Sequence, residues 1–322
     1  MRALRVSMLS DDLSGCDVAE VPEPTRGDGE LLVRVRAASL NYPDLLMTRG
    51  AYQLKPPLPF VPGMEMAGEV VAANAESGFA PGDRVVCGTR TGSFAEIVAC
   101  SAAATRQVPP SMDYATAASI GTAYLTAYVS LVRLARVQRG EWVLVHGATG
   151  GVGLATVDLA QAIGAQVIAT SRSADKLAIV AQDYAPDATL PAAGFREAVK
   201  AITGGGADVI VDPVGGDVFD ESVRAVAFGG RLVVVGFTSG RIASLATNLP
   251  LIKGFSVIGV RAGEYARRFP VLGAENLDAV WAMAAAGRLR PRVHKIYKLA
   301  DWRAAFEAMA ASDLIGKLVI EP

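Results

Sequence analysis

The chain has 322 residues, of which 51% are hydrophobic, and a formal net charge of −1. This length exceeds what one hydrophobic core usually serves, so we expect two domains. The near-zero charge argues against a protein that binds nucleic acid through phosphate contacts. The longest uncharged stretch, residues 114–132, has many hydroxyl groups and few large aliphatic side chains, which predicts a buried joining helix rather than a membrane span. With no signal peptide visible, we expect a cytoplasmic protein.

Cysteine and histidine are scarce. The three cysteines form no Cys-x-x-Cys pair, so the sequence indicates neither a zinc knuckle nor a redox dithiol. Of the two histidines, we expect His146 to be buried and hydrogen-bonded and His294 to be exposed. The chain also lacks the Gly-x-Ser-x-Gly elbow of hydrolases and the phosphate-binding P-loop.

The first part of the chain is rich in short β-like runs separated by Pro and Gly. We expect an edge strand within residues 1–10 and further strands at 30–37, 66–73, 84–87 and 93–99. This pattern predicts a compact β-rich domain. A short helix is expected over residues 42–48, with Asn41 as its cap.

An apolar run at residues 142–145 leads into a glycine-rich turn. Gly150 and Gly153 match the second and third glycines of the dinucleotide fingerprint, while Ala148 stands at the first position. Glycine permits the tight turn, and the following helix, expected over 154–163, directs free N–H groups at a pyrophosphate. The loop therefore predicts a dinucleotide site, although such a motif alone is of low specificity.

The strand expected at residues 166–170 indicates which dinucleotide is bound. An NAD site usually has an acidic residue at this strand end, which accepts hydrogen bonds from the ribose hydroxyls. Here Ser171 and Arg172 follow the strand, and Lys176 comes shortly after. Two cations without a strand-end carboxylate favour a 2′-phosphate, and hence NADPH. The alternative is that Arg172 and Lys176 are ordinary solvated charges at a helix start.

Two more strands, at 207–211 and 231–236, flank a helix expected over 218–227 and closed by Gly229-Gly230. Repeated strand, turn and helix units predict an α/β fold with a doubly wound parallel sheet. From about residue 260 this rhythm stops. We expect helices at 277–286 and 302–311 and strands at 293–298 and 317–320, packed back on the N-terminal domain.

Linked motifs then identify a family. They are Asn41-Tyr42-Pro43-Asp44, Arg49-Gly50-Ala51-Tyr52, the run from Pro62 to Gly68, Pro81-Gly82-Asp83, Gly121-Thr122-Ala123, the Gly150 loop and Gly316-Lys317. In this order they resemble the medium-chain dehydrogenase/reductase superfamily, and specifically its zinc-independent, zeta-crystallin-like NADPH:quinone oxidoreductase branch. The resemblance implies a GroES-like catalytic domain of residues 1–118 and 260–322 and a Rossmann NADPH-binding domain of residues 119–259.

The resemblance also bears on metal binding. The positions of the catalytic zinc ligands in zinc-dependent members correspond here to Asn41, Met64 and Thr122, none of which offers a thiolate or an imidazole. We therefore predict no metal. Without a Lewis acid, the substrate must delocalise the incoming charge itself, as a quinone or another conjugated carbonyl does.

The resemblance further implies the site residues. Tyr52 and Asn41 are the expected catalytic donors to a developing oxyanion; alternatively, Tyr52 only packs on the ring and Asn41 only caps a helix. The expected cofactor contacts are Asn41, Thr126, Gly150, Gly151, Val152, Gly153, Ser171, Arg172, Lys176, Phe237, Val260 and Lys317. Pro191 and Ser312 replace residues common at family cofactor positions, so the NADPH preference depends on Arg172 and Lys176.

Two other functions stay open. One is an enoyl-thioester or 2-alkenal reductase of the same superfamily, and the other is a non-catalytic, crystallin-like protein that binds NADPH or RNA. A short-chain dehydrogenase is excluded because no tyrosine is followed by lysine four residues later. For partners we expect a small quinone or enone, no nucleic acid and no membrane, and a homodimer formed through an edge strand near residues 255–260.

Overall fold

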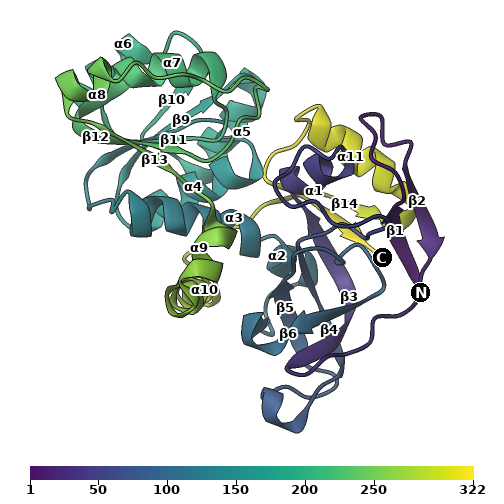
Figure 1. The fold of residues 1–322 in the computed structure, drawn as a ribbon. Helices are drawn as coiled ribbons and strands as arrows, with labels where there is room; N and C mark the ends of the chain where they lie inside the picture. Colours follow the sequence, from purple (N-terminus) through teal and green to yellow (C-terminus); the bar gives the residue numbers. More distant parts are fainter. The chain divides into compact units, whose positions relative to one another are not determined.

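The computed structural model describes the whole chain, Met1 to Pro322, as two compact units (Figure 1). The first unit comprises Met1–Thr122 and Pro291–Pro322, and the second comprises Ala123–Arg290. The structure places the second boundary between the units at 290/291, whereas the sequence-based prediction places it at 259/260. Helix α10 (Pro270–Ala285) stays with the second unit, where Arg133 Nε donates to Asn276 Oδ1 at 2.6 Å.

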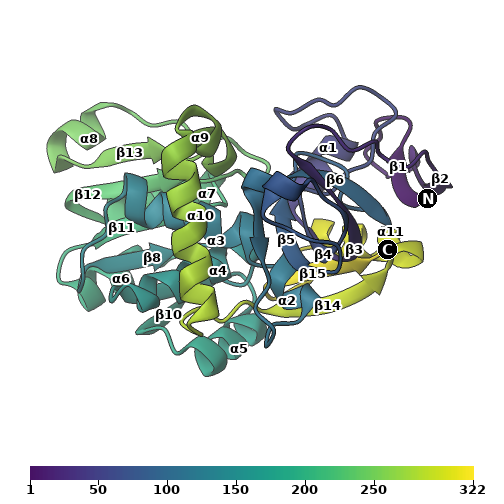
Figure 2. The ribbon, with the colours of Figure 1, turned by 90° about the horizontal axis from the view of Figure 1, so that it is seen from below.

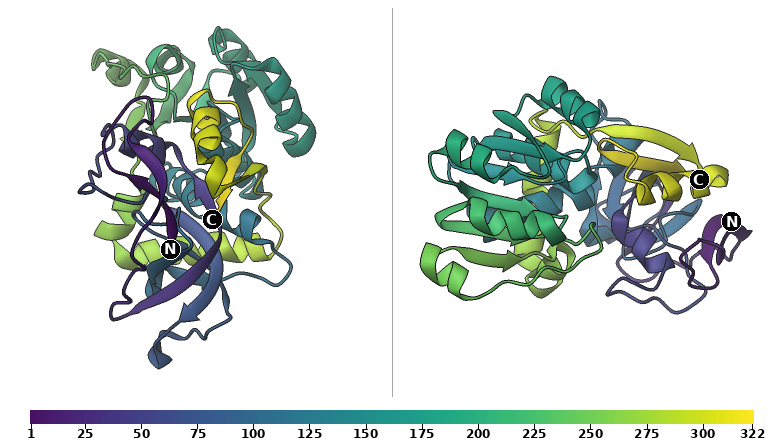
Figure 3. Two further views of the ribbon diagram at one scale, coloured as in Figure 1. Left: turned by 90° about the vertical axis from the view of Figure 1, so that its right-hand side faces the viewer. Right: turned by 90° about the horizontal axis from the view of Figure 1, so that it is seen from above.

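The first unit is built on β-sheet, in agreement with the β-rich domain predicted from the sequence. A two-stranded antiparallel sheet joins β1 to β2, and a seven-stranded sheet runs in the order β14-β15-β3-β4-β5-β7, with β6 paired to β3. Figure 3 shows the yellow C-terminal strands beside the purple N-terminal ones. The strands are β1 (Arg2–Val6), β2 (Cys16–Glu20), β3 (Glu30–Leu40), β4 (Glu65–Ala72), β5 (Arg84–Gly88), β6 (Ile97–Ser101), β7 (Thr105–Gln107), β14 (Val293–Lys298) and β15 (Lys317–Glu321).

Three short helices accompany this sheet: α1 (Tyr42–Thr48), α2 (Tyr114–Ala118) and α11 (Trp302–Ala310). The apolar face of α11 closes the core, where the Phe306 ring meets Phe94 edge-on with 6.0 Å between centroids and Trp302 with 5.7 Å. Phe94 and Phe306 are fully buried. The C-terminal segment is thus an integral part of the first unit's core, as the sequence predicts.

The second unit contains a six-stranded sheet in the order β10-β9-β8-β11-β12-β13, with every pair parallel (Figure 2). The chain winds outward from β8 to β10 and then returns to β11, so the order reverses between β8 and β11. Helices α6 and α7 lie on one side of the sheet and α4 on the other (Figure 1). The doubly wound sheet is confirmed, and the switch between β8 and β11 is where such sheets bind ligands.

The strands of this unit are β8 (Trp142–Val145), β9 (Gln166–Ser171), β10 (Ala188–Pro191), β11 (Ala207–Asp212), β12 (Val226–Val234) and β13 (Ser256–Gly259). The other helices are α3 (Gly121–Tyr128), which begins at the unit boundary, α4 (Gly151–Ala162), α5 (Ala174–Tyr184), α6 (Arg196–Thr203), α7 (Gly216–Ala225), α8 (Asn248–Lys253) and α9 (Ala262–Arg268). No helix of the chain has both the length and the apolar character needed to cross a bilayer.

Two expected elements differ from the structure. The predicted joining helix over residues 114–132 is divided into α2, α3 and a π-helical segment, Val129–Leu134, since the chain turns at Ser119 and Ile120. Gly229 and Gly230 do not end a helix but lie inside β12. A Cβ on Gly230 would approach the Asp208 carbonyl oxygen to 3.0 Å, so glycine is needed there for close packing of β12 on β11.

Candidate functional site

The glycine-rich loop connects β8 to α4 at the switch point of the parallel sheet. The helix begins at Gly151, three residues before the predicted start. A Cβ on Gly153 would lie 2.1 Å from the Gly147 carbonyl oxygen, so only glycine allows the helix to pack this closely on the loop. The N–H groups of Gly151, Val152 and Gly153 belong to the first turn, which has no intrahelical acceptor for them. The loop therefore fits a pyrophosphate.

His146 lies at the end of β8 and is fully buried, as predicted. Its Nδ1 lies 2.8 Å from Thr170 Oγ1, and its Nε2 lies 2.8 Å from Ser222 Oγ. Burial lowers the pKa of His146 to about 3, so the ring is neutral at physiological pH. The imidazole thus connects β8, β9 and α7 and has no free nitrogen for catalysis. His294 is exposed, also as predicted.

The end of β9 gathers the residues expected at a 2′-phosphate. Ser171 Oγ accepts a hydrogen bond from Ser173 N at 3.2 Å and lies 3.4 Å from Thr149 Oγ1 in the glycine-rich loop. The exposed Arg172 side chain has no partner within the chain. Lys176 belongs to the first turn of α5, where its N–H donates to the capping Ser173 Oγ at 3.3 Å. An exposed, unpaired guanidinium directly after Ser171 in the chain fits a phosphorylated ribose.

The neighbouring strand ends hold the other expected cofactor contacts of this unit. Phe237, 43% exposed, follows β12 and packs close to Gly215, where a Cβ would be 3.0 Å from its ring. Val260 is buried after β13, and its N–H donates to the Val234 carbonyl. Thr126 lies instead within α3, where its carbonyl accepts from Ser130 Oγ. Phe237 and Val260 are therefore at the carboxyl edge of the sheet, whereas Thr126 is on a helix.

Asp212, at the end of β11, is a residue that the sequence showed only as part of a turn. Its Oδ1 accepts from Val214 N at 2.7 Å and Gly215 N at 2.9 Å, which holds the turn after the strand. Its Oδ2 is buried without a partner, and burial raises the pKa of this carboxyl group. The sequence feature that could have revealed Asp212 is a carboxylate at a predicted strand end, followed by Pro213 and then by Gly215-Gly216.

The first unit contains a buried ionic cluster made of Lys317, Glu65 and Asn41. Lys317 Nζ donates to Asn41 Oδ1 at 2.6 Å and to Glu65 Oε1 at 3.0 Å, and Asn41 Nδ2 donates to the same Glu65 oxygen at 2.9 Å. All three residues are at most 5% exposed. The register explains the meeting: Leu318 of β15 pairs with Leu40 of β3, so Lys317 lies beside Asn41.

Glu65 is the member of this cluster that sequence reasoning missed. Its Oε2 accepts from Thr122 N at 2.7 Å, and a Cβ on Gly121 would lie 2.8 Å from that oxygen, so the Gly121-Thr122 motif leaves room for the carboxylate. The available signal was a lone carboxylate before the apolar run Met66–Ala67. Asn41 and the backbone of Thr122 thus contact one ion pair.

Asp44 adjoins this cluster, and Tyr52 lies elsewhere on the core of the same unit. The fully buried Asp44 carboxylate accepts from Asn41 N at 2.9 Å and from Gly63 N at 3.0 Å. Burial raises the pKa of Asp44 to about 7, against the opposing effects of those N–H groups and of Lys317. Tyr52 is half-buried and packs on the apolar core of this unit, and its hydroxyl has no hydrogen bond within the chain. Asp44 orients the backbone, whereas the Tyr52 hydroxyl is available to a ligand.

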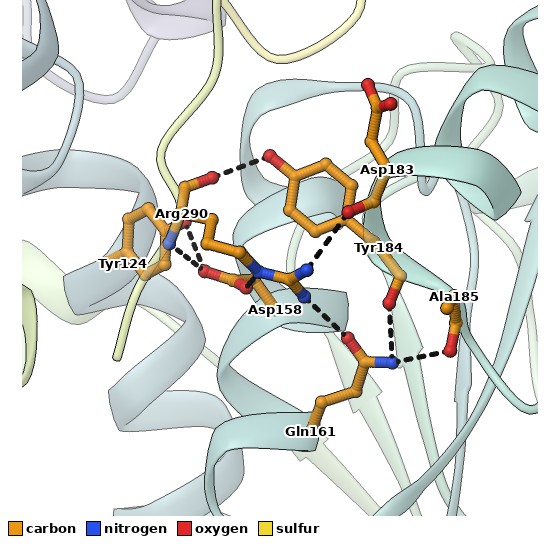
Figure 4. A network of polar contacts seen from close by, with 7 residues as sticks. All are labelled: Tyr124, Asp158, Gln161, Asp183, Tyr184, Ala185 and Arg290. Carbon is orange, nitrogen blue, oxygen red and sulfur yellow. Dashed lines mark hydrogen bonds and ion pairs between the residues drawn. The ribbon is translucent and has the colours of Figure 1, made fainter. Parts of the chain in front are cut away.

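A second polar network involves Asp158 and Gln161, in the C-terminal half of α4 (Figure 4). Asp158 Oδ2 accepts from Tyr124 Oη at 2.8 Å and from Arg290 N at 2.6 Å, and Asp158 Oδ1 accepts from Arg290 Nε at 2.9 Å. The Arg290 guanidinium lies over the Tyr184 ring at 4.7 Å and donates to Gln161. Tyr124 and Arg290 are the second and the last residues of the chain segment that forms the second unit. The Asp158 carboxylate therefore connects both ends of this segment to helix α4.

Comparison with known proteins gives two family-model matches. Residues 27–110 match the alcohol dehydrogenase GroES-like domain, and residues 151–277 match the zinc-binding dehydrogenase model. The first match confirms the GroES-like fold expected for the first unit.

Individual proteins are similar over nearly the whole chain. A quinone oxidoreductase-like protein 2 homolog of Nematostella vectensis is 37% identical over 302 residues, which cover 91% of this chain and 82% of that protein. The quinone oxidoreductase of Thermus thermophilus, known also in complex with NADPH, is 29% identical, with a TM-score of 0.84 and full coverage of both chains. The CurK enoyl reductase is 25% identical, with a TM-score of 0.89 and coverage of 99% and 98%.

Proposed function

The chain belongs to the quinone oxidoreductase family of the medium-chain dehydrogenases/reductases, and we propose that it is a metal-independent reductase that uses NADPH to reduce a quinone or a related conjugated carbonyl. The observation that carries the metal-independent part is the Lys317–Glu65 ion pair. It contacts Asn41 and Thr122, where zinc-dependent members supply ligands, and it brings an ammonium rather than a ligand set to that place. No group of three or more His, Cys, Asp and Glu side chains is arranged to hold a metal.

The second unit supplies the support for NADPH. In the proposal, Gly150, Gly151, Val152 and Gly153 hold the pyrophosphate on backbone N–H groups at the start of α4. Ser171, Arg172 and Lys176 face the 2′-phosphate. Phe237, Val260 and Thr126 complete the binding surface of this unit. The relative from Thermus thermophilus, which binds NADPH, supports the same cofactor here.

Bound NADPH supplies a hydride, so the chain needs only to orient the acceptor and stabilise the charge that forms on it. A quinone spreads this charge over an aromatic ring, and the Tyr52 hydroxyl, which has no partner within the chain, is the proposed proton donor. An enoyl thioester would form an enolate and need the same donor. The likeness to the CurK enoyl reductase favours this as the second candidate substrate class.

The cofactor assignment is tested by the double variant Arg172→Ala/Lys176→Ala. Because both cations face the 2′-phosphate in the proposal, we expect the KM for NADPH to rise at least tenfold and the KM for NADH to stay within about twofold. Arg196→Ala, which removes a half-buried arginine from the first turn of α6, is the matched control. Equal effects on both cofactors would refute the 2′-phosphate assignment.

The substrate class is tested by steady-state rates of NADPH oxidation with 1,4-benzoquinone, an alkenal and crotonyl thioester. The largest kcat/KM with the quinone supports the proposal, and the largest with the thioester favours the enoyl reductase. Tight NADPH binding without turnover of any acceptor would instead favour the non-catalytic, crystallin-like alternative. Activity that survives dialysis against a chelator supports metal independence, while loss restored by zinc would refute it.

A homodimer is part of the proposal because β13 is an edge strand of the parallel sheet. Val257 on this strand is 41% exposed, and Phe228 and Leu251 nearby in the second unit are each 83% exposed. Pairing of β13 with its counterpart in a second copy would bury these side chains. Val257→Lys should then shift the mass measured by light scattering from dimer to monomer, and an unchanged mass would place the contact elsewhere.

A further inference from the structure

The hydrogen bonds within the ionic cluster of the first unit determine which of its side chains can still donate a hydrogen bond to a substrate. The sequence-based expectation gives Asn41 this role, but a primary amide has only two N–H hydrogens. The structure uses both, since Asn41 Nδ2 donates to the Ser39 carbonyl at 3.2 Å and to Glu65 Oε1 at 2.9 Å. The amide oxygen accepts from Lys317. Asn41 is therefore occupied within the chain.

Lys317 differs from Asn41 in having a hydrogen to spare. An ammonium group carries three N–H donors, and the chain offers Lys317 two acceptors, Asn41 Oδ1 and Glu65 Oε1. The third hydrogen has no acceptor in the chain. The Lys317 side chain is 7% exposed. The ammonium group therefore contacts little water but can still be reached by a ligand.

The surroundings hold this ammonium in one place. Glu65 Oε1 and Asn41 Oδ1 fix two of its hydrogens, and Glu65 is itself fixed by Thr122 N on its other oxygen. The Glu65 carboxylate, 3.0 Å away, balances the charge of this ammonium inside the core. A cation with a fixed position and little solvent around it acts on a nearby negative charge more strongly than a cation in water.

We propose that Lys317 is a catalytic residue whose third N–H binds the substrate oxygen that becomes negatively charged, and that Asn41 and Glu65 are positioning residues for it. This inference rests on the proposed reductase function. It assigns to a lysine the electrostatic role that a metal ion has in zinc-dependent members of the family.

The reaction balances without consuming the lysine. A quinone accepts a hydride from NADPH, which carries two electrons and one hydrogen nucleus, and becomes the hydroquinone monoanion. Lys317 stabilises that anion through a charge-assisted hydrogen bond and keeps all its own protons. The second hydrogen arrives as a proton from solvent by way of Tyr52, giving the hydroquinone and NADP⁺.

The test uses the double variant Lys317→Met/Glu65→Gln in the full-length protein, so that no unpaired carboxylate is left in the core. The wild-type protein is the control, because it keeps the ammonium together with its Glu65 carboxylate. We expect kcat with 1,4-benzoquinone to fall about 100-fold or more in the double variant relative to the control, with the Kd for NADPH within about threefold. An equal kcat in both, or a loss that appears in the Kd for NADPH instead, would overturn the proposal.

A second measurement keeps the inference separate from the proposed function. 4-Nitrophenol, whose colour reports its ionisation, imitates the hydroquinone anion and requires no turnover. With NADP⁺ present, the wild-type protein should bind the phenolate at least tenfold more tightly than the double variant does. Equal phenolate affinity would refute the role of Lys317 even if the wild-type protein reduces quinones. Conversely, a phenolate preference in a protein that oxidises no NADPH would support the site while refuting the reductase function.

Discussion

Replacing Arg290 with Met is expected to destabilise the second unit by leaving a buried carboxylate without its cation. The Asp158 side chain is 1% exposed, whereas that of Arg290 is 49% exposed. Removing one partner of a fully buried ion pair costs roughly 3–5 kcal/mol. Here Asp158 Oδ2 keeps two donors, Tyr124 Oη and the backbone N of residue 290, and half of the guanidinium is in water. We therefore expect about 2 kcal/mol, or roughly 4–8 °C in Tm.

The second substitution, Asp158→Asn, makes this prediction specific. Both remaining donors use the same oxygen, Oδ2, so an Asn side chain can accept both with its amide oxygen and carries no charge. Alone, Asp158→Asn turns an amide N–H group toward Arg290 Nε and should also destabilise. The double variant should therefore be more stable than Arg290→Met alone, with a coupling energy of about 1 kcal/mol or more.

Calorimetric unfolding of the wild type, the two single variants and the double variant measures this coupling. Strictly additive changes in the free energy of unfolding would show that Asp158 and Arg290 do not act as an ion pair.

Three further predictions concern the two units separately. Gly153→Ala should raise the Kd for NADPH at least tenfold, because the added Cβ would lie 2.1 Å from the Gly147 carbonyl oxygen; an unchanged Kd in a fluorescence titration would exclude this loop as the pyrophosphate site. His146, whose pKa burial lowers from 6.5 to about 3, contributes stability that is complete above pH 6.5 and decreases below it by up to about 1.4 kcal/mol per pH unit. Denaturant titrations should show this slope in the wild type but not in His146→Asn. Tyr52→Phe should lower kcat about 100-fold with Tm unchanged, since the hydroxyl has no partner in the chain; a normal kcat would leave Tyr52 only a packing role.

Local patterns predicted much of the fold. The strand near residues 293–298 and the helix over 42–48 have the same bounds in the structure, because both were predicted from patterns of neighbouring residues. The glycine-rich loop before α4 was recognised from its glycines for the same reason. Helix starts were less exact: α4 begins at Gly151 and α10 at Pro270, both earlier than predicted, since glycine and proline are allowed in a first turn.

The ends of the parallel strands are an intermediate case. That Ser171 and Arg172 follow β9 without a carboxylate is a property of consecutive residues, so the sequence alone reveals it. That Ser171 Oγ comes within 3.4 Å of Thr149 Oγ1 depends on the parallel pairing of β8 and β9. Strand order can be expected from the α/β rhythm, and therefore the grouping of these residues could be expected as well.

By itself, then, the sequence determined the α/β class, the dinucleotide loop and the cations at the end of β9, because each depends on residues close together in the chain. Only the tertiary structure decided that Lys317 meets Asn41 and Glu65, from which it is separated by 276 and 252 residues. That meeting depends on the pairing of β15 with β3, which no local pattern specifies. The tertiary structure also decided which side chain is free to donate a hydrogen bond. Both amide hydrogens of Asn41 are used, by the Ser39 carbonyl and by Glu65, whereas Lys317 keeps one hydrogen without an acceptor.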